Sequence, residues 1–288
     1  MGSELRNRLL FGPLLAAVAL GLIATDILLA VHWGSMALAI LVLLTATREY
    51  ARLCRPLAPG VQPWSIAVVS VPLVLLVFPG QNLLETPVPL PGVLLSSALL
   101  LVCLVQMMRH GLENFTANVA ATMLGIVYLG VSMHLLVALS CIATPDDPSR
   151  GAKLLVLTLA TCKCGDIAAY FGGRAFGKHK LAPKVSPGKT WEGFVASLFG
   201  SVGGTFLFAW LLQMINPPAV FAGLWQPIVW GLILGPAGVI GDLVESCLKR
   251  AAGVKDSGAG LPGFGGYLDV FDAVLIAAPI ACGLAVFL

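Results

Sequence analysis

Long apolar runs recur along this chain, and they constrain its fold more than any other feature. Runs of roughly 20 apolar residues can cross about 30 Å of hydrocarbon, and they recur from Leu9 to the final Leu288. Charged residues make up 11% of the chain, whereas about 25% is usual for soluble domains. We therefore predict an all-α polytopic integral membrane protein, with no room between the runs for a soluble domain of ordinary size.

The runs divide into nine candidate membrane spans. They cover residues 9–31, 36–47, 66–78, 93–108, 115–142, 154–170, 194–214, 218–248 and 268–288. The first run follows Arg6 and Arg8 and is not followed by a small-residue cleavage site, so we expect a retained span rather than a signal peptide. The eighth contains Gly235-Pro236, where it either kinks or breaks into two shorter helices.

Basic residues alternate between the loops and predict the orientation. Lysine and arginine gather before the first span and after spans two, four, six and eight, whereas the intervening loops carry only Arg150 and Lys153, balanced by Asp146 and Asp147. Because cytoplasmic loops are enriched in these residues, we predict a cytoplasmic N-terminus and a C-terminus outside. A composition shift near Pro145 suggests a scaffold of five spans in residues 1–145 and a catalytic region of four spans in residues 146–288.

Composition also limits the partners of the chain. The net charge is only +3, and topology accounts for the basic residues, so nucleic-acid binding has no support. The seven cysteines are scattered and mostly lie in apolar runs, where they pack as small hydrophobes, so we predict neither a disulfide framework nor a zinc site. Small residues such as Gly200, Gly203 and Gly204 are compatible with a homodimer and equally with contacts between helices of one chain.

One helical face near the end of the eighth span is polar. It carries Asp242, Glu245, Ser246 and Lys249, at offsets of zero, three, four and seven residues. At about 1.5 Å per residue, Asp242 lies roughly 10 Å inward of Lys249. A carboxylate at that depth is costly unless it meets a cation or a water-filled cavity. Two interpretations stay open, a salt bridge at the membrane edge and a functional acid.

Two further acids open the ninth span. Asp269 and Asp272 lie one turn apart, directly after the glycine-rich segment 258–266. Glycines let backbone N–H groups approach an anion closely. If both acids face Asp242 from a neighbouring helix, the carboxylates form an all-oxygen pocket for a hard cation such as Mg²⁺. The alternative is that Asp269 and Asp272 only cap the N-terminus of their helix.

A second polar site lies in the sixth span. Lys163, Asp166 and Tyr170 fall on one face of a helix. Asp166 lies in the cytoplasmic half of the bilayer, so it must be paired, and Lys163 one turn away is the simplest partner.

The loop after the sixth span resembles part of a phosphate site. Ser186 and Pro187 suit a helix start, and a helix N-terminus carrying Lys189 and Thr190 would attract phosphate. The alternative is an ordinary basic cytoplasmic loop. Carboxylates for a divalent metal, lysines and glycines for polyphosphate, and access from the bilayer together indicate a nucleoside triphosphate that reacts with a lipid.

These residues resemble the signature of the phosphatidate cytidylyltransferase family, also called CDP-diacylglycerol synthases. That signature reads S-x-x-K-R-x4-K-D-x-G-x2-[LIF]-[PG]-x-H-G-G-x-x-D-R-x-D. The matching positions are Ser246, Lys249, Arg250, Lys255, Asp256, Gly258, Leu261, Pro262, Gly265, Gly266, Asp269 and Asp272. Two positions depart from it, because Phe264 replaces the histidine and Val270 replaces the second arginine.

A second pattern of the family is similar to the other polar site of the chain. It matches Asp166, Ala169-Tyr170 and Gly173, followed by residues 186–193. The resemblance therefore covers residues 154–288 by motif, and the N-terminal half only by its run of spans.

The resemblance implies a reaction of CTP with phosphatidic acid that gives CDP-diacylglycerol and pyrophosphate, at the cytoplasmic face of the inner membrane. It implies Mg²⁺ bound by Asp242 and Asp269, with Ser246, Lys249 and Asp272 completing the catalytic set, Asp166 as a further metal ligand, and room for a second cation. The implied substrate-binding residues are Ser186, Lys189, Thr190, Lys249, Arg250, Lys255, Asp256, Gly265 and Gly266.

Two other functions are compatible with parts of the sequence. One is a CTP-dependent enzyme acting on another lipid, such as a polyprenol or phytol kinase, which would release CDP rather than pyrophosphate. The other is a cation or proton transporter, since intramembrane acids and a kinked helix occur in such proteins. A transporter needs polar residues along its whole pathway, yet the outward halves of the spans hold almost none beyond Asp26.

Overall fold

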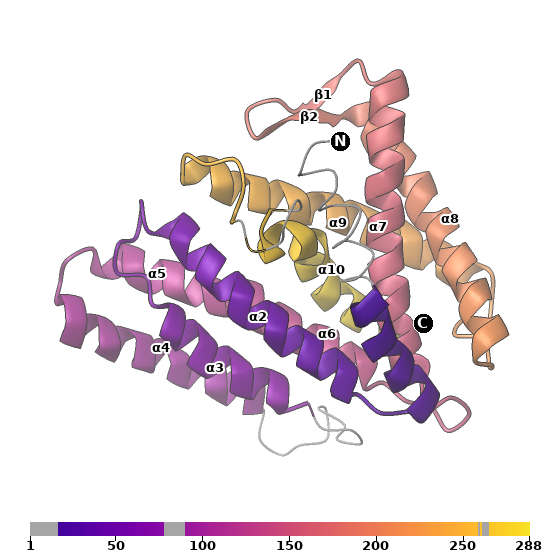
Figure 1. Cartoon of the computed structure of the whole chain (residues 1–288), viewed down its shortest axis with the longest axis horizontal. Coiled ribbons are helices and arrows are strands. Elements are labelled where there is room, and N and C mark those ends of the chain that lie inside the picture. The colour runs from indigo at the N-terminus through magenta and orange to yellow at the C-terminus, as the bar shows by residue number, and fades with distance from the viewer. Residues whose placement is uncertain (1–16, 78–89, 259, 261–264) are drawn as a thin grey trace.

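The computed structural model describes residues 17–77, 90–258, 260 and 265–288 as a helical protein with one small hairpin (Figure 1). After a first helix, Ala17–Leu29, the elements are α2 Trp33–Cys54, α3 Pro63–Leu75, α4 Leu90–His110, α5 Phe115–Gly125, the π-helical η1 Ile126–Val131, α6 Ser132–Ser140, α7 Arg150–Phe176, β1 Lys180–Ala182, β2 Ser186–Thr190, α8 Trp191–Ile215, α9 Trp225–Ala251 and α10 Tyr267–Phe287. The start of the first predicted span and the signature positions Leu261, Pro262 and Phe264 lie outside the described residues.

Six helices in the described part of the chain are long and apolar enough to cross a membrane. They are Pro91–His110, Phe115–Ser140, Arg150–Phe176, Trp191–Ile215, Trp225–Ala251 and Tyr267–Phe287. The second of these comprises α5, η1 and α6. These helices support the predicted class of helical membrane protein, with the two-stranded hairpin as its only described exception. The number of spans and the side on which each terminus lies stay predictions.

Two segments differ from the sequence-based expectations. The predicted eighth span begins at Pro218, but α9 begins only at Trp225. Residues 216–224 form a non-helical connection, in which the Gly223 amide donates to the Gln226 side chain at 2.9 Å rather than to a helical carbonyl. From Trp225, α9 runs unbroken to Ala251 with Pro236 inside it, so one helix is present and not two.

The expected helix start at Ser186 is wrong. Ser186–Thr190 forms strand β2, which pairs antiparallel with β1 so that Lys180 lies opposite Thr190. Helix α8 starts one residue later, where the Thr190 hydroxyl accepts a hydrogen bond from the Gly193 amide at 3.1 Å. The pairing with β1 keeps residues 186–190 extended, and the threonine cap then satisfies one of the first free amides of the helix.

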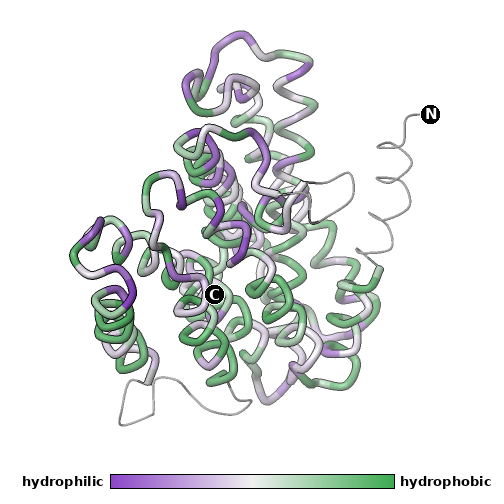
Figure 2. The backbone as a smooth tube through the Cα atoms, turned by 60° about the vertical axis from the view of Figure 1, so that its left-hand side comes forward, coloured by the Kyte–Doolittle hydropathy of each residue, from purple (hydrophilic) through white to green (hydrophobic). Residues whose placement is uncertain are grey.

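Helices α9 and α10 lie between two groups of helices in Figure 1. Helices α7 and α8 pack closely against each other on one side, and α9 contacts both of them. On the other side α10 packs against α6 and α2. Figure 2 shows hydrophobic colour along the central helices and a concentration of hydrophilic segments in the upper part of the molecule.

Glycines allow the close approach of α7 and α8. A Cβ on Gly200 would lie 2.8 Å from the Cys164 carbonyl oxygen, and one on Gly204 would lie 2.5 Å from Cys164 Cβ. A Cβ on Gly203 would meet nothing within 4 Å. Two of the three glycines singled out in the sequence therefore serve contacts within the chain.

A buried ion pair holds the turn before α7. Lys153 Nζ donates to Asp147 Oδ2 at 2.8 Å and to the Pro218 carbonyl at 3.1 Å. The side chains are 0% and 5% exposed. Of the charges predicted to balance in this loop, Lys153 and Asp147 thus make a direct contact, and the bond from Lys153 to Pro218 ties the segment before α9 to the start of α7.

Candidate active site

Three carboxylates from two helices converge at the contact between α9 and α10. Asp242, Glu245 and Asp272 each offer an oxygen, and these oxygens lie within 4.8 Å of one another. Asp242 and Glu245 share a face of α9 because they are three residues apart. Gly241 brings the helices together, since a Cβ there would lie 2.8 Å from Ala273 Cα. The helix packing therefore places Asp272 against the acids of α9, as the sequence predicts for Asp242 and Asp272.

Two lysines pair with two of these three carboxylates, Asp242 and Glu245. Lys189 Nζ, from β2, lies 2.9 Å from Asp242 Oδ2. Lys249 Nζ lies 2.5 Å from Glu245 Oε2 and 2.8 Å from Asp269 Oδ1. Both ammonium groups are mostly shielded, with 19% and 14% of the side chains exposed. The hairpin and the end of α9 thus bring positive charge to the same place as the carboxylates.

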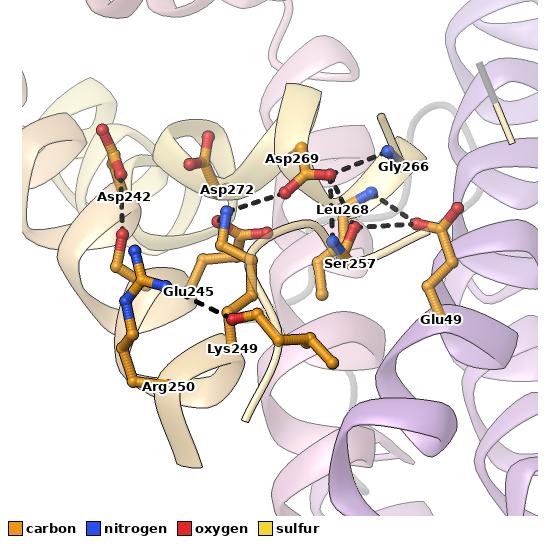
Figure 3. A network of polar contacts seen from close by, with 12 residues as sticks. Glu49, Asp242, Glu245, Lys249, Arg250, Ser257, Gly266, Leu268, Asp269 and Asp272 are labelled. Carbon is orange, nitrogen blue, oxygen red and sulfur yellow. Dashed lines mark hydrogen bonds and ion pairs between the residues drawn. The ribbon is translucent and has the colours of Figure 1, made fainter. Parts of the chain in front are cut away.

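Asp269 lies one turn before Asp272 and has different partners. Its Oδ2 accepts hydrogen bonds from the Gly266 amide at 2.7 Å and from the Ser257 hydroxyl at 2.9 Å. The first of these bonds caps the start of α10. The capping alternative considered for the two acids is therefore confirmed for Asp269, whereas Asp272 joins the carboxylate cluster (Figure 3).

Asp166 is not among the three carboxylates whose oxygens converge in the described part of the chain. Its Oδ2 is 3.3 Å from Lys163 Nζ, one turn away on α7, and the two side chains are 36% and 46% exposed. This is the partner that the sequence suggests for it. Tyr170 is exposed on the same helix and receives a hydrogen bond from Arg174 at 3.4 Å.

The remaining predicted site residues surround the cluster at different depths. The Ser246 hydroxyl donates to Asp242 Oδ1 at 3.3 Å. Arg250 Nε donates to the Val185 carbonyl at 3.2 Å and so links the end of α9 to the hairpin. Gly265 has a positive φ of 90°, a conformation that favours glycine. Ser186 is half-buried in β2, Lys255 and Asp256 are exposed, and the Thr190 hydroxyl is used as the cap of α8.

Comparison with known proteins decides the family. The model of the "Cytidylyltransferase family" matches residues 13–288. The chain belongs to this family.

Several relatives of this cytidylyltransferase-family chain carry a more specific name, and one does not. A "Phosphatidate cytidylyltransferase" of Brucella suis is 41% identical over 156 residues, which cover 54% of this chain and 53% of the relative. One of Haemophilus influenzae is 43% identical over 137 residues, 46% of each chain. The "Uncharacterized protein YnbB" of Escherichia coli is 40% identical over 137 residues, 47% of this chain and 44% of that protein. The chain thus spans about half the length of the relatives it matches.

Two acids near this family site were not predicted as site residues. Glu245 shares the polar face of Asp242, and its spacing of three residues was the signal that could have identified it. Glu49 comes from α2 and accepts a hydrogen bond from the Leu268 amide at 2.9 Å. No spacing in the sequence connects Glu49 with residues so far along the chain, so only the fold reveals it.

Proposed function

We propose that this chain transfers the cytidylyl group of CTP to phosphatidic acid, giving CDP-diacylglycerol and pyrophosphate. The observation that carries the proposal is the convergence of Asp242, Glu245 and Asp272 beside Lys189 and Lys249, at the contact between two membrane-length helices. Such a site combines metal-binding oxygens with cations for phosphate. The relatives named phosphatidate cytidylyltransferase support the choice of substrates.

The three converging carboxylates fit Mg²⁺, which prefers oxygen ligands. Oε1 of Glu245 is buried and has no hydrogen-bond partner within the described residues, whereas Oε2 is paired with Lys249. Asp242, Glu245 and Asp272 would hold the ion, and it would polarise the phosphoryl oxygens of the substrate. Asp269 and Asp166 stay proposed as further ligands, and a second cation is compatible with so many acids.

The reaction needs positioning more than acid–base chemistry. A phosphate oxygen of the lipid attacks the α-phosphorus of CTP, a new P–O bond forms, and the bond to the β-phosphate breaks to release pyrophosphate. The lipid phosphate is already an anion at neutral pH, so no strong base is required. Lys189 and Lys249 would bind the phosphates and orient them, with Arg250 and Lys255 as outer cations. Ser246, Ser186 and the glycine-rich loop would add hydrogen bonds.

We also propose the orientation indicated by the basic loops. The chain would cross an inner membrane nine times. The N-terminus and the site would lie on the cytoplasmic side, and the C-terminus would lie outside. Lys189 and Lys249, at the ends of β2 and α9, would then meet soluble CTP, while the lipid enters from the bilayer. Assembly as a homodimer stays a proposal, and no nucleic-acid partner is proposed.

A second candidate is a CTP-dependent enzyme that acts on another lipid. The observation in its favour is Val270, which lies within α10 where the family signature has an arginine. A transporter has less support, because Asp26, the outward acid, is used to cap α2 through bonds of 2.9 and 2.7 Å to the amides of Gly34 and Ser35.

The test is pyrophosphate release by the purified protein in detergent with CTP, phosphatidic acid and Mg²⁺. We expect lipid-dependent release that Asp242→Asn lowers by at least about 100-fold, as for other groups that act directly on the transition state. Asp146→Asn, an exposed acid in the turn before α7, serves as the matched control and should keep full activity. Release of CDP instead would favour a kinase, and a wild-type protein that forms neither product would overturn the proposal.

A further inference from the structure

Glu49 is a buried acid of α2, in the N-terminal half of the chain, and it contacts residues at and before the start of α10 in the C-terminal half. It lies near the end of α2 and is only 5% exposed. Its Oε2 accepts a hydrogen bond from the Leu268 amide at 2.9 Å and lies 3.5 Å from the Ser257 hydroxyl. Leu268 is in the first turn of α10, whose amides have no partner within the helix. The carboxylate therefore supplies an acceptor and a negative charge at a helix N-terminus, where both are favourable.

Three glycines of the glycine-rich segment 258–266 lie close to this carboxylate. A Cβ on Gly258 would lie 2.8 Å from Glu49 Oε1, and one on Gly260 would lie 3.0 Å from the same atom. A Cβ on Gly266 would lie 2.5 Å from Glu49 Oε2. Real Cβ atoms essentially never come as close as the distances at Gly258 and Gly266, so a side chain there would displace either the backbone or the acid, and at Gly260 the acid would have to shift slightly. Glu49 therefore contributes to the need for glycine at these positions, and at Gly258 it supplies all three of the nearest atoms.

The contacts continue from Glu49 to the acids of the site (Figure 3). Ser257 donates through its backbone amide and its hydroxyl to Asp269 Oδ2, at 3.2 and 2.9 Å. Asp269 in turn accepts from Lys249 at 2.8 Å. Asp272 follows Asp269 by three residues on the same helix. The position of the first turn of α10 therefore determines the position of Asp272 relative to Asp242.

We propose that Glu49 is a positioning residue for the cytidylyl transfer. It holds the first turn of α10 and Ser257, so that Asp269 and Asp272 reach their places beside Lys249 and Asp242. Its hydrogen-bond partners in the described part of the chain are Leu268 and Ser257, not the converging acids Asp242, Glu245 and Asp272. The inference rests on the proposed function for its kinetic consequence, but the contact itself is independent of catalysis.

The first experiment compares Glu49→Ala and Glu49→Gln with a matched exposed acid, Glu113→Ala. Removing a group that orients the ligands of a metal site lowers activity by about 10–100-fold, and we expect this loss in kcat for Glu49→Ala with little change in KM for CTP. Glu49→Gln keeps an oxygen that can accept from Leu268, so it should recover part of the loss. Thermal unfolding in detergent checks that each variant is folded.

Hydrogen exchange gives a readout that needs no activity. In the protein without substrates, Glu49→Ala should speed exchange of the amides of Ser257, Gly266 and Leu268, whereas Glu113→Ala should not. If kcat and exchange of both Glu49 variants equal those of the wild type, the inference is overturned. If the wild type itself makes no product but exchange responds as expected, the proposed function fails while the positioning contact stands.

A double-mutant cycle tests the contact directly. The three atoms nearest to a Cβ on Gly258 all belong to Glu49. Gly258→Ala should therefore speed exchange of the Leu268 amide in the wild-type background and have a smaller effect once Glu49→Ala has made room. Contacting residues give such non-additive effects, whereas independent sites add. Additive effects of Gly258→Ala and Glu49→Ala would contradict the proposal.

Discussion

Several lysines form ion pairs with acidic side chains, and these ion pairs differ in their exposure to solvent. The Lys153–Asp147 pair is almost fully buried, whereas both members of the Lys163–Asp166 pair are more than a third exposed. An exposed pair is screened by solvent and stabilises little. Removing one member of a buried pair leaves an uncompensated charge in a medium that solvates it poorly. The same kind of contact therefore has different consequences at the two sites.

Lys153→Met tests this difference at the residue scale. Among the residues that the structure describes, it leaves the buried Asp147 with the Ser149 amide and hydroxyl as its side-chain donors, so we expect a loss of about 3–5 kcal/mol in unfolding free energy. The measurement is thermal or denaturant unfolding in a defined detergent.

Lys163→Met is the matched control for that substitution. Its pair is exposed, so the change should be about 0–1 kcal/mol. The double variant Lys153→Met/Asp147→Leu should regain part of the lost stability. If Lys153→Met and Lys163→Met lowered the unfolding free energy equally, burial would not determine how much each ion pair contributes to stability.

At the scale of elements, small residues decide how closely the helices approach. Gly200 and Gly204 face Cys164 across the contact between α7 and α8, while the site of Gly203 is open. In a membrane, helices associate through van der Waals packing, because lipid is as apolar as the helix surface. The hairpin connects α7 to α8, so the packing of these two helices also positions Lys189 of the hairpin next to Asp242 of α9.

Gly204→Ala tests this packing. Its Cβ would lie 2.5 Å from Cys164 Cβ and 2.7 Å from Cys164 Sγ. Such overpacking costs about 1–3 kcal/mol of stability. Gly203→Ala makes the same chemical change one residue earlier in open space, and it should be neutral or raise stability by up to about 1 kcal/mol. The measurement is the unfolding midpoint of each variant. If Gly203→Ala were destabilised and Gly204→Ala had the stability of the wild type, the described contact of Gly204 with Cys164 would be wrong.

The cap of α8 permits a second test at this scale. Thr190→Ala removes the acceptor of the Gly193 amide and should cost about 1 kcal/mol. Thr190→Ser keeps the hydroxyl and should restore both stability and pyrophosphate release. If Thr190→Ser instead has the stability of the wild type but reduced activity, the threonine methyl group acts on the substrate rather than on the cap.

At the scale of the whole molecule, the two predicted regions share one hydrophobic core. Buried residues such as Leu43 and Tyr50 from the first region belong to the same cluster as Leu268 and Ala273 from the second. Glu49 adds a polar link across the same boundary. The division near Pro145 stays a useful description of where the motifs lie, and the packing joins both sides of it.

Local patterns in the sequence predicted the parts of the site that lie on one helix. The spacing of Asp242, Ser246 and Lys249 placed them on one face, and the structure confirms it with contacts from Ser246 to Asp242 and from Lys249 to Glu245. The partners of Asp269 depend on the path of the loop before α10, which spacing does not determine. Glu49 and Leu268 are 219 residues apart, and no period in the sequence relates them.

The proposed orientation can be tested by labelling from one side of the membrane. Lys184 lies in the exposed turn of the hairpin, and Asp146 is exposed in the turn before α7. In a variant without the exposed Cys247, a membrane-impermeant maleimide added to right-side-out vesicles should label Asp146→Cys and leave Lys184→Cys unlabelled. Lys184→Cys should react after permeabilisation. The opposite pattern would invert the proposed topology and place the site outside.

The helices differ widely in how much of their surface the protein itself covers. In the most apolar window of each, 17% of Pro91–His110 is buried, compared with 72% of Phe115–Ser140. Most side chains of α4 therefore have only to be apolar, whereas those of α5, η1 and α6 must also match the shape of their neighbours. Under selection for function, α4 should drift freely among leucine, valine and isoleucine while the neighbouring helix accepts few exchanges, so the rate of evolution would record the outline of the packed interior.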